Sequence, residues 1–444
     1  MADRPLTGLY DPQPREDVIA DLRGRLRRRL TALPEPALVA LLEDAVYQER
    51  RRLERADPAS RAPVERLARA LVHRPGGDDR VSAALDLVGA WADEIHGRFS
   101  MPAYRFATSV FPPALQALLS SQTGGAAAGE RITIDGPIDL LRELAGEATL
   151  LLTPTHVSNL DSPLIGLALA TAGLPPFQYG AGLNLFSNPL VGWWMRRLGA
   201  YTVDRTKKAA LYKLVLKDYS IRQLRTRHHG LFFPGGTRSR SGLIETRVKK
   251  GLLGTGLAAW QENLAAGRAD PDVYVVPMTL SFQLTLEAST LIDDHLAEIG
   301  KQRYIISDDE FAQPRRVAQF VHRVLSLDAA CVVRFGQPLD VLGNPVPADR
   351  AGRAEASRRR RAYVCDRAGQ VEWDEQRDHL YTERLAHQLT QAWPGLATVM
   401  TSHLAAWAAW RTLERRLDTR DPFRLVRASA EERRLPAADL LEAL

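Results

Sequence analysis

Apolar side chains recur with a helical period along the first 120 residues of the chain. The clearest stripe spans residues 15–30, where the apolar positions are Val18, Ile19, Leu22, Leu26 and Leu30. Spacings of three and four place such residues on one face of an α-helix. Comparable patterns predict further helices at 37–56, 63–73, 80–97 and 112–121. We therefore expect an N-terminal helical region over residues 1–125, followed by a linker in the Gly-Gly-Ala-Ala-Ala-Gly run at 124–129.

From residue 131 onwards, short apolar runs alternate with helical patterns. The runs predict strands at 131–135, 149–153, 177–181, 199–204, 230–234, 273–280 and 331–335. The patterns between them predict helices at 138–146, 162–172, 206–226, 247–266 and 314–326. Such alternation is typical of an α/β fold. We expect a mixed, largely parallel sheet flanked by helices over residues 130–345.

The remaining residues, 346–444, return to a helical pattern. Helices are predicted at 375–392 and 397–416, and the last thirty residues look peripheral. The fold class is therefore α/β, with helical regions at both ends of the chain.

One predicted strand delivers two reactive side chains to its end. Residues 149–153 are an apolar run, and His156 follows them directly. Asp161 opens the next predicted helix, for which Ser158 or Asn159 is a candidate cap. A neutral imidazole beside a carboxylate can remove a proton from an alcohol, because the carboxylate fixes the tautomer and stabilises the imidazolium.

The spacing of this pair is not specific by itself. A second histidine precedes an aspartate by five positions at His73 and Asp78, within a polar loop that contains Pro-Gly-Gly. A histidine that merely caps a loop is the alternative at His156. The neighbouring motifs must therefore decide between the two interpretations.

A second predicted strand, at 199–204, ends in positive charge. Arg205 follows it, with Lys207 and Lys208 shortly after. A guanidinium group matches a phosphate with two parallel hydrogen bonds, so Arg205 is a candidate anion ligand. For the two lysines, an ordinary surface charge explains the pattern equally well.

The segment Gly-Gly-Thr-Arg-Ser-Arg-Ser-Gly at 235–242 has the composition of a phosphate-binding loop. Gly235 and Gly236 allow the backbone to approach a ligand closely. Thr237 adds a hydroxyl, and in an extended segment Arg238 and Arg240 lie on the same side. The loop is not a P-loop, because it lacks the Gly-x4-Gly-Lys-Ser/Thr pattern. A flexible surface loop is the alternative.

These segments together resemble the glycerol-3-phosphate and lysophosphatidate acyltransferase family. The resemblance covers residues 130–345 and rests on four motifs in order: His-Val-Ser-Asn-Leu-Asp at 156–161, the strand at 199–205, Phe-Pro-Gly-Gly-Thr-Arg-Ser-Arg-Ser-Gly at 233–242, and Val-Val-Pro at 275–277. It implies transfer of a fatty acyl group from an acyl thioester to a glycerophosphate hydroxyl. The thioester, on coenzyme A or an acyl-carrier protein, is a co-substrate, and no cofactor or metal is expected.

The resemblance also implies roles for individual residues. His156 is the general base and Asp161 orients it. The expected phosphate-binding residues are Arg205, Gly235, Gly236, Thr237, Arg238 and Arg240. Pro277 is expected to shape the wall on the acyl side. The sequence departs from the family at Gly235, where a glutamate is usual.

The acceptor follows less directly from the resemblance. The helical flanks, and the Tyr-Thr-Glu-Arg-Leu-Ala stretch at 381–386, resemble the larger glycerol-3-phosphate acyltransferases, so glycerol-3-phosphate is the expected acceptor and its 1-acyl derivative the alternative. A relative that binds lipid without catalysis is an alternative from another class. A dinucleotide-binding oxidoreductase is disfavoured, because the Gly-x-Gly-x-x-Ala stretch at 254–259 does not follow a predicted strand.

The composition indicates the compartment and the partners to expect. The chain has 444 residues, a net charge of +6 and only two cysteines, Cys331 and Cys365, which suits a reducing compartment. The positive charge favours anionic partners such as phosphorylated substrates and an anionic membrane surface, whereas no nucleic-acid recognition motif is present. Prolines and glycines interrupt the uncharged stretch at 162–195, so no spanning helix is predicted. We expect a cytoplasmic protein attached peripherally to the inner membrane, with Trp193 and Trp194 at the interface.

Overall fold

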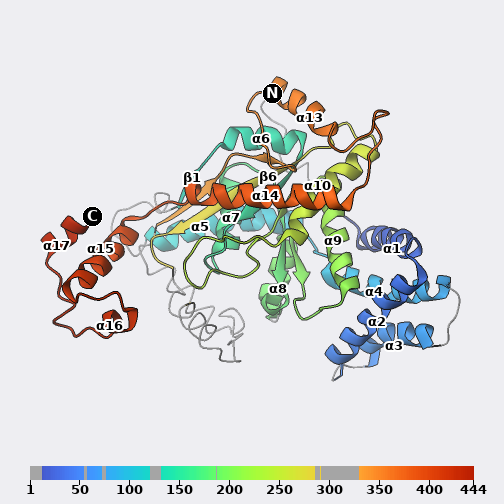
Figure 1. Ribbon diagram of the computed structural model, residues 1–444, viewed down its shortest axis with the longest axis horizontal. Coiled ribbons are helices and arrows are strands. Elements are labelled where there is room, and N and C mark those ends of the chain that lie inside the picture. The colour runs from blue at the N-terminus through green and yellow to red at the C-terminus, as the bar shows by residue number, and fades with distance from the viewer. Residues whose placement is uncertain are drawn as a thin grey trace.

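One mixed sheet forms the centre of the molecule (Figure 1). The computed structural model describes residues 13–54, 58–72, 77–120, 132–186, 188–285, 291 and 330–444. The strands are β1 (Ile132–Asp135), β2 (Thr149–Pro154), β3 (Gln178–Gly182), β4 (Ala200–Val203), β5 (Gly230–Leu231), β6 (Val273–Phe282), β7 (Cys331–Phe335) and β8 (Leu339–Asp340). Their order is β1-β7-β6-β2-β5-β3-β4, and β8 pairs with β6.

Most strand pairs in the sheet are parallel. Strand β2 pairs in parallel with β5 on one side and β6 on the other, and β3 pairs in parallel with β4 and β5. The pairs that β6 makes with β7 and β8 are antiparallel. The predicted fold class, a mixed and largely parallel sheet flanked by helices, is confirmed.

The pleat of β2 sends alternate side chains into two separate cores. Leu150 and Leu152 belong to the core beneath α6 (Ile138–Glu147) and α7 (Asp161–Thr171). Leu151 belongs to the opposite core. That second core is covered by α9 (Ala210–Arg225), α10 (Lys250–Ala265) and α14 (Glu375–Leu396). Because both faces of β2 are buried, its sequence is continuously apolar instead of alternating.

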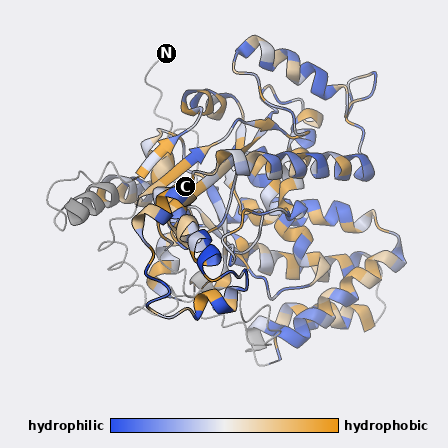
Figure 2. Cartoon of the chain, turned by 60° about the vertical axis from the view of Figure 1, so that its left-hand side comes forward, coloured by the Kyte–Doolittle hydropathy of each residue, from blue (hydrophilic) through white to orange (hydrophobic). Residues whose placement is uncertain are grey.

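The N-terminal helices pack against the sheet domain through α9. They are α1 (Arg15–Thr31), α2 (Glu35–Arg52), α3 (Pro58–Val72) and α4 (Gly77–Ile95), and a fifth, α5 (Met101–Ser120), follows. Helices α1 to α4 share one hydrophobic core with α9. Figure 2 shows apolar and polar positions on each of these helices, as the amphipathic pattern predicts. The basic face of α1 is partly internal, because Arg25 is buried and donates two hydrogen bonds to Glu262, of 2.6 and 2.7 Å.

The C-terminal residues contribute α13 (Arg350–Arg361), α14, α15 (Thr401–Arg416), α16 (Pro422–Val426) and α17 (Ala437–Ala443). Helix α14 crosses the face of the sheet, whereas α15 to α17 lie at the opposite end of the molecule from α1 to α4 (Figure 1). The buried Trp393 of α14 donates a hydrogen bond from Nε1 to the carbonyl oxygen of Thr153 in β2, at 3.0 Å. The predicted region boundaries at 125, 130 and 345 stay a prediction.

Two predicted elements differ markedly from the structure. Helix α5 begins at Met101 and not at residue 112, because Pro102 lies in the first turn, where its missing N–H breaks no helical hydrogen bond. Strand β5 ends after two residues, because Pro234 cannot donate to a ladder and the chain turns at Gly236. Helix α13 was not predicted.

Helix α8 (Pro189–Arg197) was missed because Pro189 was interpreted as a helix breaker. In the structure it is the first helical residue. Asn188 caps the helix by accepting hydrogen bonds from Leu190 N at 3.1 Å and Val191 N at 3.3 Å. An asparagine followed by proline is a start signal for a helix, and it was present in the sequence.

Some expectations lie outside the described residues, namely the linker at 124–129 and the helix at 314–326. Within the described residues, no helix is both long and apolar enough to cross a membrane. The Gly-x-Gly-x-x-Ala stretch at 254–259 lies inside helix α10, so it does not form the turn that a dinucleotide site requires. Both cysteines are free thiols.

Candidate active site

His156 and Asp161 lie together at the carboxyl end of β2. The imidazole Nδ1 is 2.7 Å from Asp161 Oδ2. The same oxygen accepts hydrogen bonds from the backbone N–H groups of Val157 at 2.8 Å and Ser158 at 3.0 Å. Because Asp161 is the first residue of α7, the tight loop from the strand to the helix brings its carboxylate back beneath the histidine.

This arrangement decides which imidazole nitrogen is available for chemistry. An ionised carboxylate only accepts hydrogen bonds, so Nδ1 of His156 carries the proton and donates it to Asp161. The lone pair is then on Nε2. The Asp161 side chain is fully buried, whereas that of His156 is 19% exposed. The pair therefore has an internal carboxylate that orients a base with access to solvent.

An aromatic ring supports the other side of the histidine. The rings of His156 and Phe233 stack with centroids 4.0 Å apart and an interplanar angle of 23°. Phe233 follows β5, the parallel neighbour of β2. The imidazole is therefore held at its edge by Asp161 and on its face by Phe233.

The glycine- and arginine-containing loop at 235–242 lies against the histidine. The backbone N–H of Ser239 donates to the carbonyl oxygen of His156 at 2.7 Å. Gly236 turns the chain with a φ of +79°, and its N–H donates to Phe233 O at 3.0 Å. That φ favours glycine, because a side chain in this conformation is strained. The sequence predicted these two motifs separately, and the parallel pairing of β2 with β5 brings them together.

The predicted phosphate-binding residues on this loop are exposed to solvent to different degrees. Thr237 is exposed, and Gly235, Gly236, Arg238 and Arg240 are half-buried. Both arginines are therefore partly buried, and their side chains are more restricted than on an open surface.

A residue that the sequence analysis missed lies above this loop. A Cβ atom on Gly236 would meet the side chain of Lys249, with its Cε only 2.6 Å away. Lys249 is anchored by its backbone N–H, which donates to Pro234 O at 2.8 Å, and it directly precedes α10. Its ammonium group therefore adds positive charge beside Gly236. The signal in the sequence was the Lys-Lys pair at the start of α10.

Arg205 lies at the same edge of the sheet as His156, but further along it. It follows β4, which β3 and β5 separate from β2. Three strand spacings put these two chain segments about 14 Å apart. The participation of Arg205 in phosphate binding stays a prediction.

The two lysines after Arg205 differ from each other. Lys207 is buried, forms an ion pair with Glu94, and lies near the rings of Trp91 and Tyr212. It therefore joins the N-terminal helices to the sheet domain and is neither a surface charge nor a ligand. Lys208 is exposed, in agreement with a surface charge.

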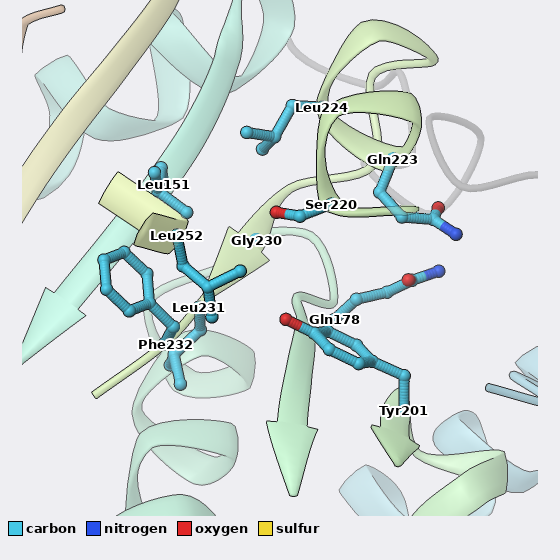
Figure 3. Close-up of a pocket in the computed structure, with 10 residues that line it drawn as sticks. All are labelled: Leu151, Gln178, Tyr201, Ser220, Gln223, Leu224, Gly230, Leu231, Phe232 and Leu252. Carbon is cyan, nitrogen blue, oxygen red and sulfur yellow. The ribbon is translucent and has the colours of Figure 1, made fainter. Parts of the chain in front are cut away.

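An internal cavity beneath the sheet is separate from this site (Figure 3). It has a volume of about 10 Å³, roughly the room that one water molecule requires. Leu151, Leu231, Phe232 and Leu252 line one side, and polar side chains of Gln178, Tyr201, Ser220 and Gln223 line the other. Neither His156 nor the loop at 235–242 contributes to it. The cavity is too small for a glycerophosphate or an acyl chain.

Comparison with known proteins agrees with the resemblance seen in the sequence. The family described as Acyltransferase matches residues 132–281, which contain the strands and loops of this site. Residues 132–281 are therefore an acyltransferase domain. A glycerol-3-phosphate acyltransferase of Xanthomonas axonopodis pv. citri is 27% identical over 224 residues, which are 48% of this chain and 24% of that protein.

Other relatives have similar names. A glycerol-3-phosphate acyltransferase of Histophilus somni is 32% identical over 34% of this chain and 18% of its own length. A dihydroxyacetone phosphate acyltransferase of Bos taurus is 31% identical over 35% of this chain and 22% of its own. The chain matches about a quarter or less of the length of these curated relatives. These relatives confirm the predicted resemblance to glycerol-3-phosphate acyltransferases.

Among solved structures, a 1-acyl-sn-glycerophosphate acyltransferase from Thermotoga maritima is similar over 65% of this chain and 92% of its own. The sequence identity is 13% and the TM-score is 0.29.

Proposed function

We propose that this acyltransferase domain moves a fatty acyl group from an acyl thioester to a hydroxyl of glycerol-3-phosphate. The observation that carries the proposal is the position of an oriented imidazole beside the glycine- and arginine-containing loop at 235–242. His156 Nδ1 lies 2.7 Å from the Asp161 carboxylate, and the 235–242 loop is hydrogen-bonded to the His156 backbone. One molecule with a hydroxyl near a phosphate can contact both features at once.

The reaction needs one proton carrier and no covalent enzyme intermediate. The acceptor oxygen attacks the thioester carbonyl carbon while Nε2 of His156 takes the hydroxyl proton. The buried Asp161 carboxylate stabilises the imidazolium that forms. The tetrahedral intermediate then breaks its carbon–sulfur bond. The departing thiolate takes the proton from Nε2, which gives an ester, a thiol and the starting histidine.

The phosphate of the acceptor provides the binding energy that positions the hydroxyl. Arg238 and Arg240 extend from the loop that touches His156, and Gly235 and Gly236 leave room for close approach to the backbone. Thr237 supplies a hydroxyl, and Lys249 adds a further cation. We extend this set to Arg205, since its strand ends at the same edge of the sheet.

The acceptor that we propose is glycerol-3-phosphate. The names of the curated relatives from Xanthomonas axonopodis and Histophilus somni support it. The 1-acyl derivative of glycerol-3-phosphate is the second candidate, and Gly235 gives a specific reason to test it, since the family usually has glutamate there. Competition between both acceptors at equal concentration, with the products identified by mass, distinguishes them.

We further propose that the domain works on an anionic membrane surface, at the cytoplasmic face of the inner membrane. Exposed apolar side chains gather on two contacting helices, α5 and α8, and on the turn η3 (Leu183–Phe186) before α8. They are Phe106, Val110, Leu183, Leu190 and Trp193. The guanidinium group of Arg197 lies 3.8 Å from the centre of the Trp193 ring.

Aromatic and basic side chains in one patch fit the boundary between lipid chains and anionic headgroups. Sedimentation with liposomes of anionic phospholipid tests this surface, with neutral liposomes as the control. Binding should fall when Trp193 and Leu190 are both replaced by serine. Unchanged binding of that variant would exclude this patch.

Replacing the base tests the central proposal. His156→Ala should lower kcat for acyl transfer by about 10²- to 10⁴-fold, the usual contribution of a general base. His387→Ala is the matched control, because His387 is exposed on α14 and makes none of the contacts described for the site. Wild-type rates in the His156 variant would refute the assignment of the base. An inactive wild-type protein that still binds lipid would support the non-catalytic alternative.

A further inference from the structure

Gly235 is a glycine because another side chain occupies the space beside it. A Cβ atom built on Gly235 would lie 2.7 Å from Cγ of Glu245 and 3.0 Å from its Oε1. Real Cβ atoms do not approach other heavy atoms so closely, so a larger residue would displace Glu245. The backbone does not require glycine, since Gly235 is not among the residues with a positive φ. The restriction comes from Glu245.

Glu245 comes from the segment between the phosphate-binding loop and α10, and its carboxylate reaches the catalytic loop. Oε1 accepts a hydrogen bond from the backbone N–H of His156 at 2.9 Å. Oε2 is buried and has no hydrogen-bond partner within the described part of the chain. Burial raises the pKa of this carboxyl, and the His156 N–H opposes the rise. An acidic group held inside the structure in this way is more constrained than a surface glutamate.

Three contacts then fix the backbone and the ring of one residue. Glu245 binds the His156 N–H, Ser239 N–H binds the His156 carbonyl oxygen, and Asp161 binds Nδ1. Only the contact with Asp161 was expected from the motifs. The contact with Glu245 comes from a residue that no motif contains.

We propose that Glu245 supplies, from ten residues further along the chain, the carboxylate that Gly235 lacks, and that it positions His156 for proton transfer. The proposal rests on the proposed function. In this role Glu245 is a positioning residue, since it holds the backbone N–H of His156 and not a reacting atom. The carboxylate comes from position 245 instead of position 235, but it lies beside the same loop.

Moving the carboxylate back to position 235 tests the idea. Glu245→Ala should lower kcat by up to about 10²-fold, because small displacements of a catalytic group cost that much, whereas KM for the acyl donor should stay within about threefold. Gly235→Glu alone should also be impaired, because two glutamates compete for one space. The double variant Gly235→Glu with Glu245→Ala should recover to within about threefold of the wild-type kcat.

Two further variants serve as controls. Glu245→Gln keeps an oxygen that accepts from the His156 N–H, so its kcat should lie within about threefold of the wild type. Gly146→Glu adds a glutamate at a glycine whose Cβ would meet nothing within 4 Å, so it should leave activity unchanged. A double variant that is no more active than either single variant would overturn the proposal. Full activity of Glu245→Ala would overturn it as well.

A second measurement does not depend on acyl transfer. Hydrogen–deuterium exchange of the peptide that contains His156 should become faster in Glu245→Ala, because its amide loses its acceptor, and should slow again in the double variant. Thermal unfolding should show that Gly235→Glu lowers Tm in the wild-type background and not in Glu245→Ala. If the wild type transfers no acyl group, the proposed function fails. If the two substitutions changed exchange and Tm additively, Gly235 and Glu245 would not share one space. That result would overturn the role of Glu245.

Discussion

Asp161→Asn separates the orienting role of this carboxylate from its charge. In the wild type, Asp161 Oδ2 accepts from His156 Nδ1 and from the N–H groups of Val157 and Ser158. In the variant, the amide oxygen must take this place, because an NH₂ group there would face three donors. Nδ1 of His156 therefore keeps its proton, and the correct tautomer survives. Only the negative charge is lost.

The size of the effect follows from Coulomb's law. The Nδ1 to Oδ2 distance is 2.7 Å, so the centres of the imidazolium and carboxylate charges lie about 4 Å apart. With an effective dielectric constant of about 20, their attraction is about 4 kcal/mol. Since about 1.4 kcal/mol corresponds to a factor of ten in rate, kcat should fall about 10³-fold.

The stability of the fold should fall by a similar free energy. Each of the three hydrogen bonds becomes neutral and loses about 1 kcal/mol, and the new NH₂ group takes the place of Oδ1, which is buried without a partner within the described residues. We expect about 3 to 5 kcal/mol less stability to urea, with circular dichroism showing a folded protein at low denaturant. The assay is release of thiol from the acyl donor, with Asp139→Asn on the exposed surface of α6 as the control. A folded variant with less than about a tenfold loss in kcat would refute the electrostatic argument.

Three further predictions concern separate parts of the molecule. Arg238→Lys should raise KM for the phosphorylated acceptor more than KM for the acyl donor, because an ammonium group cannot form the paired hydrogen bonds of a guanidinium, and steady-state kinetics with each substrate varied in turn would show it. A silent variant would exclude Arg238 from phosphate binding. Trp393→Phe removes the hydrogen bond to Thr153 O and leaves a void in the core, so urea unfolding should show a loss of about 2 to 4 kcal/mol, and an unchanged midpoint would contradict this. Burial, with Arg222 nearby, lowers the pKa of His96 from 6.5 to about 4. The unfolded chain therefore binds a proton that the folded chain does not, and stability is lost as the pH falls from 6.5 to about 4. His96→Phe should show a flatter dependence of Tm on pH in that window, and equal slopes would contradict the prediction.

Local patterns in the sequence were sufficient for much of the fold. The apolar run at 149–153 predicted a buried strand, and β2 is buried over all six of its residues. The stripe from Val18 to Leu30 predicted α1, because apolar residues at this spacing lie on one face only if the chain is an α-helix. Local patterns failed where a proline had two meanings, as at Pro189, because proline ends a helix from inside and is tolerated in its first turn.

For the candidate site, the sequence determined the short-range geometry. His156 and Asp161 are five positions apart on a strand-to-helix connection, so the contact between them is decided locally. The same is true of the turn at Gly236, whose positive φ is a property of that residue and its neighbours.

Only the tertiary structure decided what lies next to these local units. The stacking of Phe233 on His156 follows from the parallel pairing of β5 with β2, which no local pattern specifies. Lys207 was predicted to be either an anion ligand or a surface charge, yet packing of the N-terminal helices on α9 buries it beside Glu94. The sequence showed that a glutamate was missing at Gly235, and the fold brought Glu245 into the space beside it. Contacts between residues distant in sequence depend on how the whole chain packs, and one chain's local pattern carries no information about that packing.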